Sequence, residues 1–131
     1  MAHEEPPIDW LAIHNAGREG RLMELLVKLP RERWAVQDED GFTLLHYACF
    51  GPNVAAAVAL LQSGVDVNAR NRESTTAAHI AALFCRPRVL EVLCAAGADV
   101  RSMDECHRTV LDCALQHKAA SCARVLLANG V

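Results

Sequence analysis

Histidine and aspartate side chains recur along this chain at a fixed spacing. His46, His79 and Asp112 are each separated by 33 residues, and His14 lies 32 residues before His46. Imidazole and carboxylate groups could act as general bases or bind a metal ion. A fixed period, however, indicates that these side chains occupy equivalent positions in a repeated structural unit. The spacing therefore favours a structural role over an active site.

The six cysteines invite a disulfide or a zinc site. One interpretation is a zinc site near the C-terminus formed by Cys106, His107, Cys113 and His117. Its spacing fits no standard pattern, and the chain has no Cys-x-x-Cys pair. Four cysteines take small or apolar positions of the repeated unit and are expected in the core: Cys49, Cys94, Cys113 and Cys122. Cys85 and Cys106 are expected at exposed turns. Free thiols predict a reduced protein that is cytoplasmic or nuclear.

Length and composition exclude several functions. With 131 residues, 52% apolar residues and a net charge of −3, the chain fits one domain with a continuous core. It has no basic stripe for nucleic acid and no apolar stretch that would span a membrane. The acidic segment 1–7 lacks a hydrophobic signal sequence. Neither a glycine-rich phosphate loop nor a serine elbow occurs, so we predict no cofactor and no enzymatic activity.

The period predicts pairs of short helices. Threonines three residues before His46, His79 and Asp112 can cap first helices over 10–17, 44–50, 77–84 and 110–117. Second helices are expected over 21–29, 53–62, 87–95 and 119–128, with Pro52 and Pro87 at two of their starts. Glycines at the same 33-residue step can end them: Gly64, Gly97 and Gly130. Leucines should interlock between neighbouring units: Leu60, Leu61, Leu93, Leu126 and Leu127.

These units resemble the ankyrin repeat family. Segments 43–48, 76–81 and 109–114 are similar to its Thr-x-Leu-His-x-Ala core, with Asp112 in place of histidine in the last unit. The resemblance implies an all-α solenoid of stacked helix-turn-helix units with β-hairpin loops. It implies one domain over 1–131, with repeats at about 8–37, 38–70, 71–103 and 104–131, the first a divergent N-terminal cap. It also implies that His14, His46 and His79 tie one hairpin to the next. A complete small protein and a fragment of a longer one are both compatible with the C-terminal end.

Ankyrin proteins bind partners through hairpin tips and the exposed face of their first helices. The resemblance therefore assigns partner-binding positions to Glu39, Asp40, Phe42, Phe50, Arg72, Glu73, Thr75, Leu83, Phe84, Glu105, Arg108, Gln116 and His117. Phe50, Leu83 and Phe84 form an apolar stretch between polar ends, as in many interfaces. The alternative is that these side chains fold down to cover small residues. Asp38, Asp40 and Asp104 are expected to face solvent and set the turns.

Asn68 carries a second interpretation. Its loop, residues 65–69, is similar to ankyrin loops whose asparagine is hydroxylated by an oxygen-sensing dioxygenase, and Leu60 lies eight residues before it. The alternative is that Asn68 braces the turn. The resemblance therefore names Asn68 as a candidate hydroxylation site.

The family resemblance favours a non-enzymatic interaction module that acts as an adaptor, scaffold or inhibitor of another protein. A second hypothesis is the targeting portion of a larger enzyme or of a ubiquitin-ligase adaptor. A third is similarity to the four-repeat inhibitors of cyclin-dependent kinases, suggested by segment 8–12 and the four units. A metal- or redox-sensing protein is a fourth. We expect a monomer or weak dimer, because the apolar stretch and the open C-terminal end could each support self-association.

Overall fold

The computed structural model describes residues 7–131, so residues 1–6 of the expected domain and most of the acidic N-terminal segment lie outside the described part. Residues 7–131 form helices and loops without extended strands. The elements are α1 (Trp10–Glu19), α2 (Leu22–Leu26), η1 (Arg31–Arg33), α3 (Leu44–Ala48), α4 (Ala55–Gln62), α5 (Ala77–Leu83), α6 (Pro87–Ala95), α7 (Val110–Gln116) and α8 (Ala120–Ala128). None of these helices is long and apolar enough to cross a bilayer.

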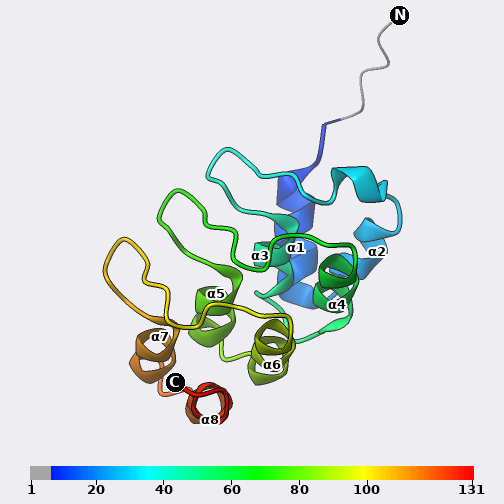
Figure 1. Ribbon diagram of the computed structural model, residues 1–131. Coiled ribbons are helices and arrows are strands. Elements are labelled where there is room, and N and C mark those ends of the chain that lie inside the picture. The colour runs from blue at the N-terminus through cyan, green and yellow to red at the C-terminus, as the bar shows by residue number, and fades with distance from the viewer. Residues whose placement is uncertain (1–6) are drawn as a thin grey trace, which may run out of the picture.

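The helices stack as four pairs in two layers (Figure 1). The first helices α1, α3, α5 and α7 pack in sequence in one layer, and α2, α4, α6 and α8 pack in sequence in the other. The loops that precede α3, α5 and α7 project to one side of the stack. A backbone hydrogen bond closes each loop as a hairpin: Asp38 N to Phe42 O, Asn71 N to Thr75 O, and Asp104 N to Arg108 O. The prediction of an all-α repeat solenoid is confirmed.

Three first helices begin at the predicted threonines Thr43, Thr76 and Thr109. Each threonine is extended, and its side chain accepts a hydrogen bond from the N–H three residues later. The side chain at that later position accepts the threonine's own N–H in return. This reciprocal cap satisfies two backbone donors that lack partners at a helix start. It therefore helps these helices, which are only five to seven residues long, to form.

The starts of the second helices agree with the sequence predictions only in part. Pro87 begins α6 as predicted, and the glycines at 64, 97 and 130 take positive φ angles after their helices. The prediction for Pro52 is wrong, because α4 begins three residues later at Ala55. Asn53 lies between them, and its Oδ1 accepts a hydrogen bond from Ala55 N at 2.9 Å.

Helix α1 lies very close to α3 and to the turn that follows α3, and glycines occupy both points of close approach. A Cβ atom added to Gly17 would lie 2.2 Å from Tyr47 O, and one added to Gly51 would lie 2.0 Å from Gly17 O. Any larger residue would therefore force the backbones apart. This close approach brings the side chains of α1 next to those around Tyr47.

The core lies between the two helix layers and continues through all four repeats. Leu60, Leu93 and Leu126 occupy equivalent positions and are fully buried. Leu61 is half-buried, but the prediction for Leu127 is wrong, since it is 60% exposed. Leu127 lies on the outer side of α8, where no further described helix covers it.

We expect Leu93→Ala to lower the free energy of unfolding by about 2–5 kcal/mol, because it leaves a cavity in the middle of the stack. Leu127→Ala makes the same chemical change at an exposed site and should alter stability by about 0.5 kcal/mol or less. Urea denaturation of both variants measures the difference. Equal losses would contradict the burial seen at these two positions.

Candidate interaction surface

Two buried histidines join neighbouring repeats through the hairpins. His46 Nε2 lies 2.8 Å from Thr75 O, and His79 Nε2 lies 2.9 Å from Arg108 O. In each histidine, Nδ1 accepts the N–H of the capping threonine, at 3.0 Å for His46 and 3.2 Å for His79. Nδ1 is therefore unprotonated, and Nε2–H donates to the carbonyl of the next hairpin. Both ring nitrogens of each histidine are therefore used in structural hydrogen bonds, as the sequence predicted for His46 and His79.

The last repeat has only half of this arrangement. Asp112 Oδ2 accepts the N–H of Thr109 at 2.9 Å, which preserves the helix cap. An ionised carboxylate only accepts hydrogen bonds and has no N–H with which to donate to a carbonyl. Asp112 therefore caps its own helix without offering a donor to a hairpin beyond it.

The prediction that His14 ties two hairpins together is wrong. Helix α1 is capped by Asp9, whose Oδ1 accepts a hydrogen bond from Ala12 N at 3.1 Å. Ala12 therefore occupies the position that His46 and His79 take in their own helices, and His14 lies two residues past it. Its ring instead packs against Tyr47 and Phe50, with centroid separations of 5.6 and 5.3 Å.

The hairpin tips form a continuous row of exposed residues. Backbone hydrogen bonds of 2.9 Å join neighbouring tips, from Arg72 N to Asp40 O and from Glu105 N to Glu73 O. We call the exposed charged side chains on these tips the tip row: Glu39, Asp40, Arg72, Glu73 and Glu105. Four of its five members are carboxylates, so the row is mainly negative.

A side chain at the base of each hairpin holds its tip in shape. Asp38, Asn71 and Asp104 each accept two backbone N–H groups, from residues two and four positions later. The expected turn-setting role of Asp104 is thus seen, but the prediction that it faces solvent is wrong, since it is buried. Burial opposes ionisation of Asp104, but hydrogen bonds from the backbone and side chain of Arg108 outweigh it and lower the pKa of the carboxyl. Asp104 is therefore a buried anion matched to a cation.

Side chains from three repeats meet in an aromatic patch. We define it by its six members: Trp10, His14, Phe42, Tyr47, Phe50 and Phe84. The Phe50 ring is central, with centroids 4.8 Å from Phe84, 5.8 Å from Tyr47 and 6.4 Å from Phe42. Tyr47 is buried, and burial, together with its hydrogen bond to Asp38, raises the pKa of the phenol. Phe84 is 42% exposed, so the patch reaches the surface.

Most of the apolar stretch folds down onto its neighbours, as the second interpretation expected, and partner binding through the stretch stays a prediction. Phe42 and Phe50 are half-buried and pack on their neighbours, and Leu83 is likewise half-buried against the core. Phe84 is the most exposed member of the stretch. Sequence reasoning missed Trp10 and His14 as members of the patch. The available signal was that His14 falls one residue outside the 33-residue period.

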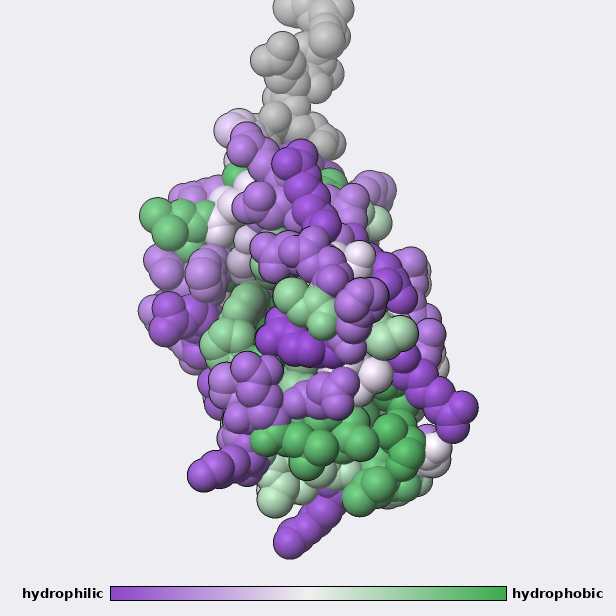
Figure 2. Space-filling view, turned by 90° about the vertical axis from the view of Figure 1, so that its left-hand side faces the viewer, coloured by the Kyte–Doolittle hydropathy of each residue, from purple (hydrophilic) through white to green (hydrophobic). Residues whose placement is uncertain are grey.

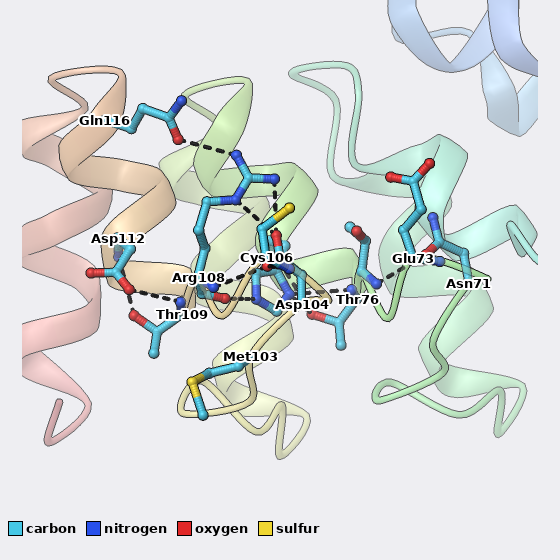
Figure 3. A network of polar contacts seen from close by, with 12 residues as sticks. Asn71, Glu73, Thr76, Met103, Asp104, Cys106, Arg108, Thr109, Asp112 and Gln116 are labelled. Carbon is cyan, nitrogen blue, oxygen red and sulfur yellow. Dashed lines mark hydrogen bonds and ion pairs between the residues drawn. The ribbon is translucent and has the colours of Figure 1, made fainter.

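The fourth repeat contributes a separate polar group of predicted residues (Figure 3). Arg108 forms an ion pair of 2.9 Å with Asp104 Oδ2 and donates to Gln116 Oε1 at 3.2 Å. Gln116 and His117 are exposed at the end of α7. The chain therefore brings Arg108 and Gln116 together, apart from the aromatic patch. Thr75 is half-buried, and its carbonyl is the partner of His46.

Asn68 braces the loop between two repeats. Its Oδ1 accepts a hydrogen bond from Asp99 N at 2.7 Å, and its own N–H donates to Asp66 Oδ1 at 2.9 Å. The structural interpretation of Asn68 is therefore seen directly. The residue is also exposed, and its hydroxylation stays a prediction.

The cysteines separate into exposed and covered thiols. Cys85 and Cys106 are exposed, whereas Cys49, Cys113 and Cys122 are buried, and Cys94, which was expected in the core, is only half-buried. Burial raises the pKa of the Cys113 thiol to about 11 and also raises the pKa of Cys49 and Cys122. Among residues 7–131 no group of three or more histidine, cysteine or acidic side chains is placed to hold a metal ion.

The repeat geometry agrees with the comparison to known families. The model for ankyrin repeats (3 copies) matches residues 54–131, which is more than half of the chain. This chain belongs to the ankyrin repeat family. Ankyrin repeats are generally non-catalytic modules that bind other proteins.

Three relatives place the repeats in longer proteins. The chain is 31% identical over 123 residues to an E3 ubiquitin-protein ligase KEG of Arabidopsis thaliana, covering 91% of this chain and 8% of that protein. It is 32% identical to a mouse B-cell lymphoma 3 protein homolog, covering 69% of this chain and 21% of the relative. Chicken inversin is 34% identical, with 70% of this chain and 8% of inversin covered. The chain thus spans at most about a fifth of these relatives.

The buried histidines should make stability depend on pH. Burial lowers the pKa of His46 and His79 below the ordinary 6.5, so the unfolded chain binds protons more readily than the folded chain. Stability should be fully present above pH 6.5 and decrease as the pH falls below it. Urea denaturation across this range measures the slope, and His79→Asn should reduce it. The variant should also lose about 1–3 kcal/mol at neutral pH, because the Arg108 carbonyl loses its donor.

Asp112→Asn is the matched control for this measurement. It changes the equivalent position in the last repeat, where the side chain caps only its own helix, so the slope between neutral and mildly acidic pH should stay as in the wild type. An unchanged slope in His79→Asn would contradict the role assigned to the buried imidazole.

Thiol labelling under native conditions should divide the six cysteines. We expect Cys85 and Cys106 to react rapidly and the half-buried Cys94 to react more slowly, whereas Cys49, Cys113 and Cys122 should react only as the chain unfolds, because they are buried and their thiolates are disfavoured. Peptide mapping after a short exposure to a maleimide identifies the labelled sites. Rapid labelling of Cys49 under native conditions would contradict the burial of this thiol in the core.

Proposed function

We propose that this chain is a non-enzymatic module that binds a protein partner through the aromatic patch and the tip row, as an adaptor, scaffold or inhibitor. The observation that carries the proposal is the aromatic patch, which joins three repeats and exposes Phe84 at the surface. Interfaces commonly centre on aromatic anchors surrounded by polar groups. The patch and the tip row supply both components.

The proposed surface is well ordered before a partner arrives. Phe84 rests against the Phe50 ring, and the tips are joined to one another by backbone hydrogen bonds. Side chains and loops that are already ordered lose less conformational entropy on binding. Such a surface favours recognition of a folded or extended partner segment without rearrangement of the repeats.

The charges around the aromatic patch indicate which charges the partner should carry. Glu39 and Asp40 lie on the same hairpin as Phe42, and the remaining tips add Glu73 and Glu105 against the single cation Arg72. A mainly negative rim attracts basic partner residues and speeds association at low salt. The partner is therefore expected to combine an apolar side chain for Phe84 with basic groups for the tips.

The second candidate is that the same surface targets a larger protein to its partner, for example within a ubiquitin ligase. The observation that favours it is the alignment of 91% of this chain with a short part of a ligase. Binding by the repeats would be the same in both cases. No contact among residues 7–131 favours the resemblance to cyclin-dependent kinase inhibitors. The free thiols of the described residues support a reducing location in the cytoplasm or nucleus.

Partner capture tests the proposed surface. We expect Phe84→Ala to weaken binding by about 2 kcal/mol or more if this ring is a central anchor, and Glu39→Lys with Asp40→Lys to weaken it in a salt-dependent way. Affinity capture from cell lysate with quantitative mass spectrometry identifies the partner, and titration with the purified partner gives the affinities. Phe84 is preferred to Phe50, because Phe50 also supports the packing of the patch.

Val27→Ala is the matched control. Val27 is an apolar residue that is 69% exposed just beyond α2, in the second helix layer, so its loss should leave capture unchanged. Circular dichroism confirms that each variant is folded. A partner retained equally by Phe84→Ala and by the tip variant would contradict the proposed surface.

A further inference from the structure

The turn between α5 and α6 carries an exposed thiol close to a buried one from the next repeat. Cys85 lies in this turn, directly after Phe84, with a positive φ angle of 56°. Cys122 lies in the first turn of α8 and is fully buried. One thiol is therefore open to reagents in solution, and the other is covered.

The sulfur of Cys122 packs against the backbone of this turn. Ala81 O accepts a hydrogen bond from Arg86 N at 2.8 Å, and Cys122 Sγ lies 3.9 Å from the same oxygen. Cys85 is the residue that immediately precedes Arg86. A single carbonyl thus brings α8 of the fourth repeat against the segment that carries Cys85.

A side chain at the position of Cys85 points toward the next repeat. Gly20 ends α1 in the equivalent turn, also with a positive φ angle. A Cβ atom added to Gly20 would lie 3.3 Å from Asn53 Cβ, just before α4. At the 33-residue period Asn53 corresponds, two repeats later, to Ala119 just before α8, and Cys122 lies one turn beyond Ala119. The Cys85 side chain is therefore placed to face the turn of α8 that holds Cys122.

The two thiols also interact electrostatically. Burial raises the pKa of the Cys122 thiol, and Cys85 raises it further, because two neighbouring thiolates would repel each other. The Arg86 N–H faces the Cys122 sulfur and acts in the opposite direction on this pKa. Cys122 therefore ionises reluctantly, and its reaction as a thiolate should become faster as the pH rises.

We propose that Cys85 and Cys122 form a disulfide between the third and fourth repeats when the chain meets a low-molecular-weight disulfide such as oxidised glutathione. The exposed Cys85 thiolate attacks one sulfur of the oxidant, which forms a mixed disulfide and releases one small thiolate. The Cys122 thiolate then attacks Cys85 Sγ and expels the second small thiolate. The two cysteines lose two electrons and two protons in total, and the oxidant gains them.

The disulfide would fix the fourth repeat to the third. Helix α7 packs on α5, and α8 packs on α6, at the lower end of the stack in Figure 1. Figure 2 shows hydrophobic atoms gathered over this end of the molecule. Separation of the two repeats would expose further apolar surface, such as the buried Leu126, so a covalent link here should oppose local opening of the stack.

Oxidation followed by peptide mapping tests the site. The folded chain is incubated with oxidised glutathione at mildly alkaline pH, its remaining thiols are alkylated, and its peptides are analysed by mass spectrometry without reduction. We expect a cross-linked Cys85–Cys122 peptide that lacks two hydrogen atoms and disappears after treatment with dithiothreitol. The link should form faster at higher pH, and the melting temperature of the oxidised chain should rise, because the link restricts the unfolded state.

Three single variants separate the steps of the reaction. Cys122→Ser should stop it at a mixed disulfide on Cys85, and Cys85→Ser should leave Cys122 reduced. The matched control is Cys106→Ser, which removes another exposed thiol and should cross-link like the wild type. Circular dichroism checks the fold of each variant. If serine in the core unfolds the chain, Cys122→Ala replaces it.

Three results would overturn the proposal. They are a wild type in which Cys85 stays reduced or remains a mixed disulfide, a wild type in which Cys85 pairs with a different cysteine, or a Cys106→Ser variant that loses the link. Each result is obtained without a binding partner. The disulfide therefore stands or fails independently of the proposed interaction surface.

Discussion

No helix pair in this chain can bury its apolar surface by itself. Each pair has a core between its two helices and a further apolar side that only a neighbouring pair can cover, as Cys49 and Ala82 show by their complete burial. Stability in such a stack depends on the sum of repeat and interface contributions. The order of the described part of the molecule, including the aromatic patch and the tip row, therefore depends on this burial between repeats.

The hairpins are positioned by a second interaction that accompanies the packing. His46 and His79 use one ring nitrogen to cap their own helix and the other to hold the next hairpin. Backbone hydrogen bonds then carry the connection outward from tip to tip. The charged tip row is thus fixed relative to the helices. A buried imidazole serves this role because it has an acceptor and a donor in one ring.

The two ends of the stack depart from this arrangement in different ways. In the first repeat His14 is displaced from the capping position and contributes to the aromatic patch. In the last repeat Asp112 keeps the cap without the donor, and Leu115 enlarges the exposed surface. The proposed binding surface therefore includes a residue at which the first repeat deviates from the others, while the regular repeats supply the scaffold.

The sequence by itself determined the repeat period, because equivalent residue types recur every 33 positions. It also determined the helix pairs and the capping threonines, because these depend on residues only a few positions apart. It also indicated Phe84 and the hairpin tips as exposed. Only the tertiary structure decided that His14 joins the aromatic patch, that Asp104 is buried beside Arg108, and that Leu127 lies uncovered. Exposure and ring contacts depend on which surface of a neighbouring repeat lies opposite, and residue spacing within one repeat does not contain that information.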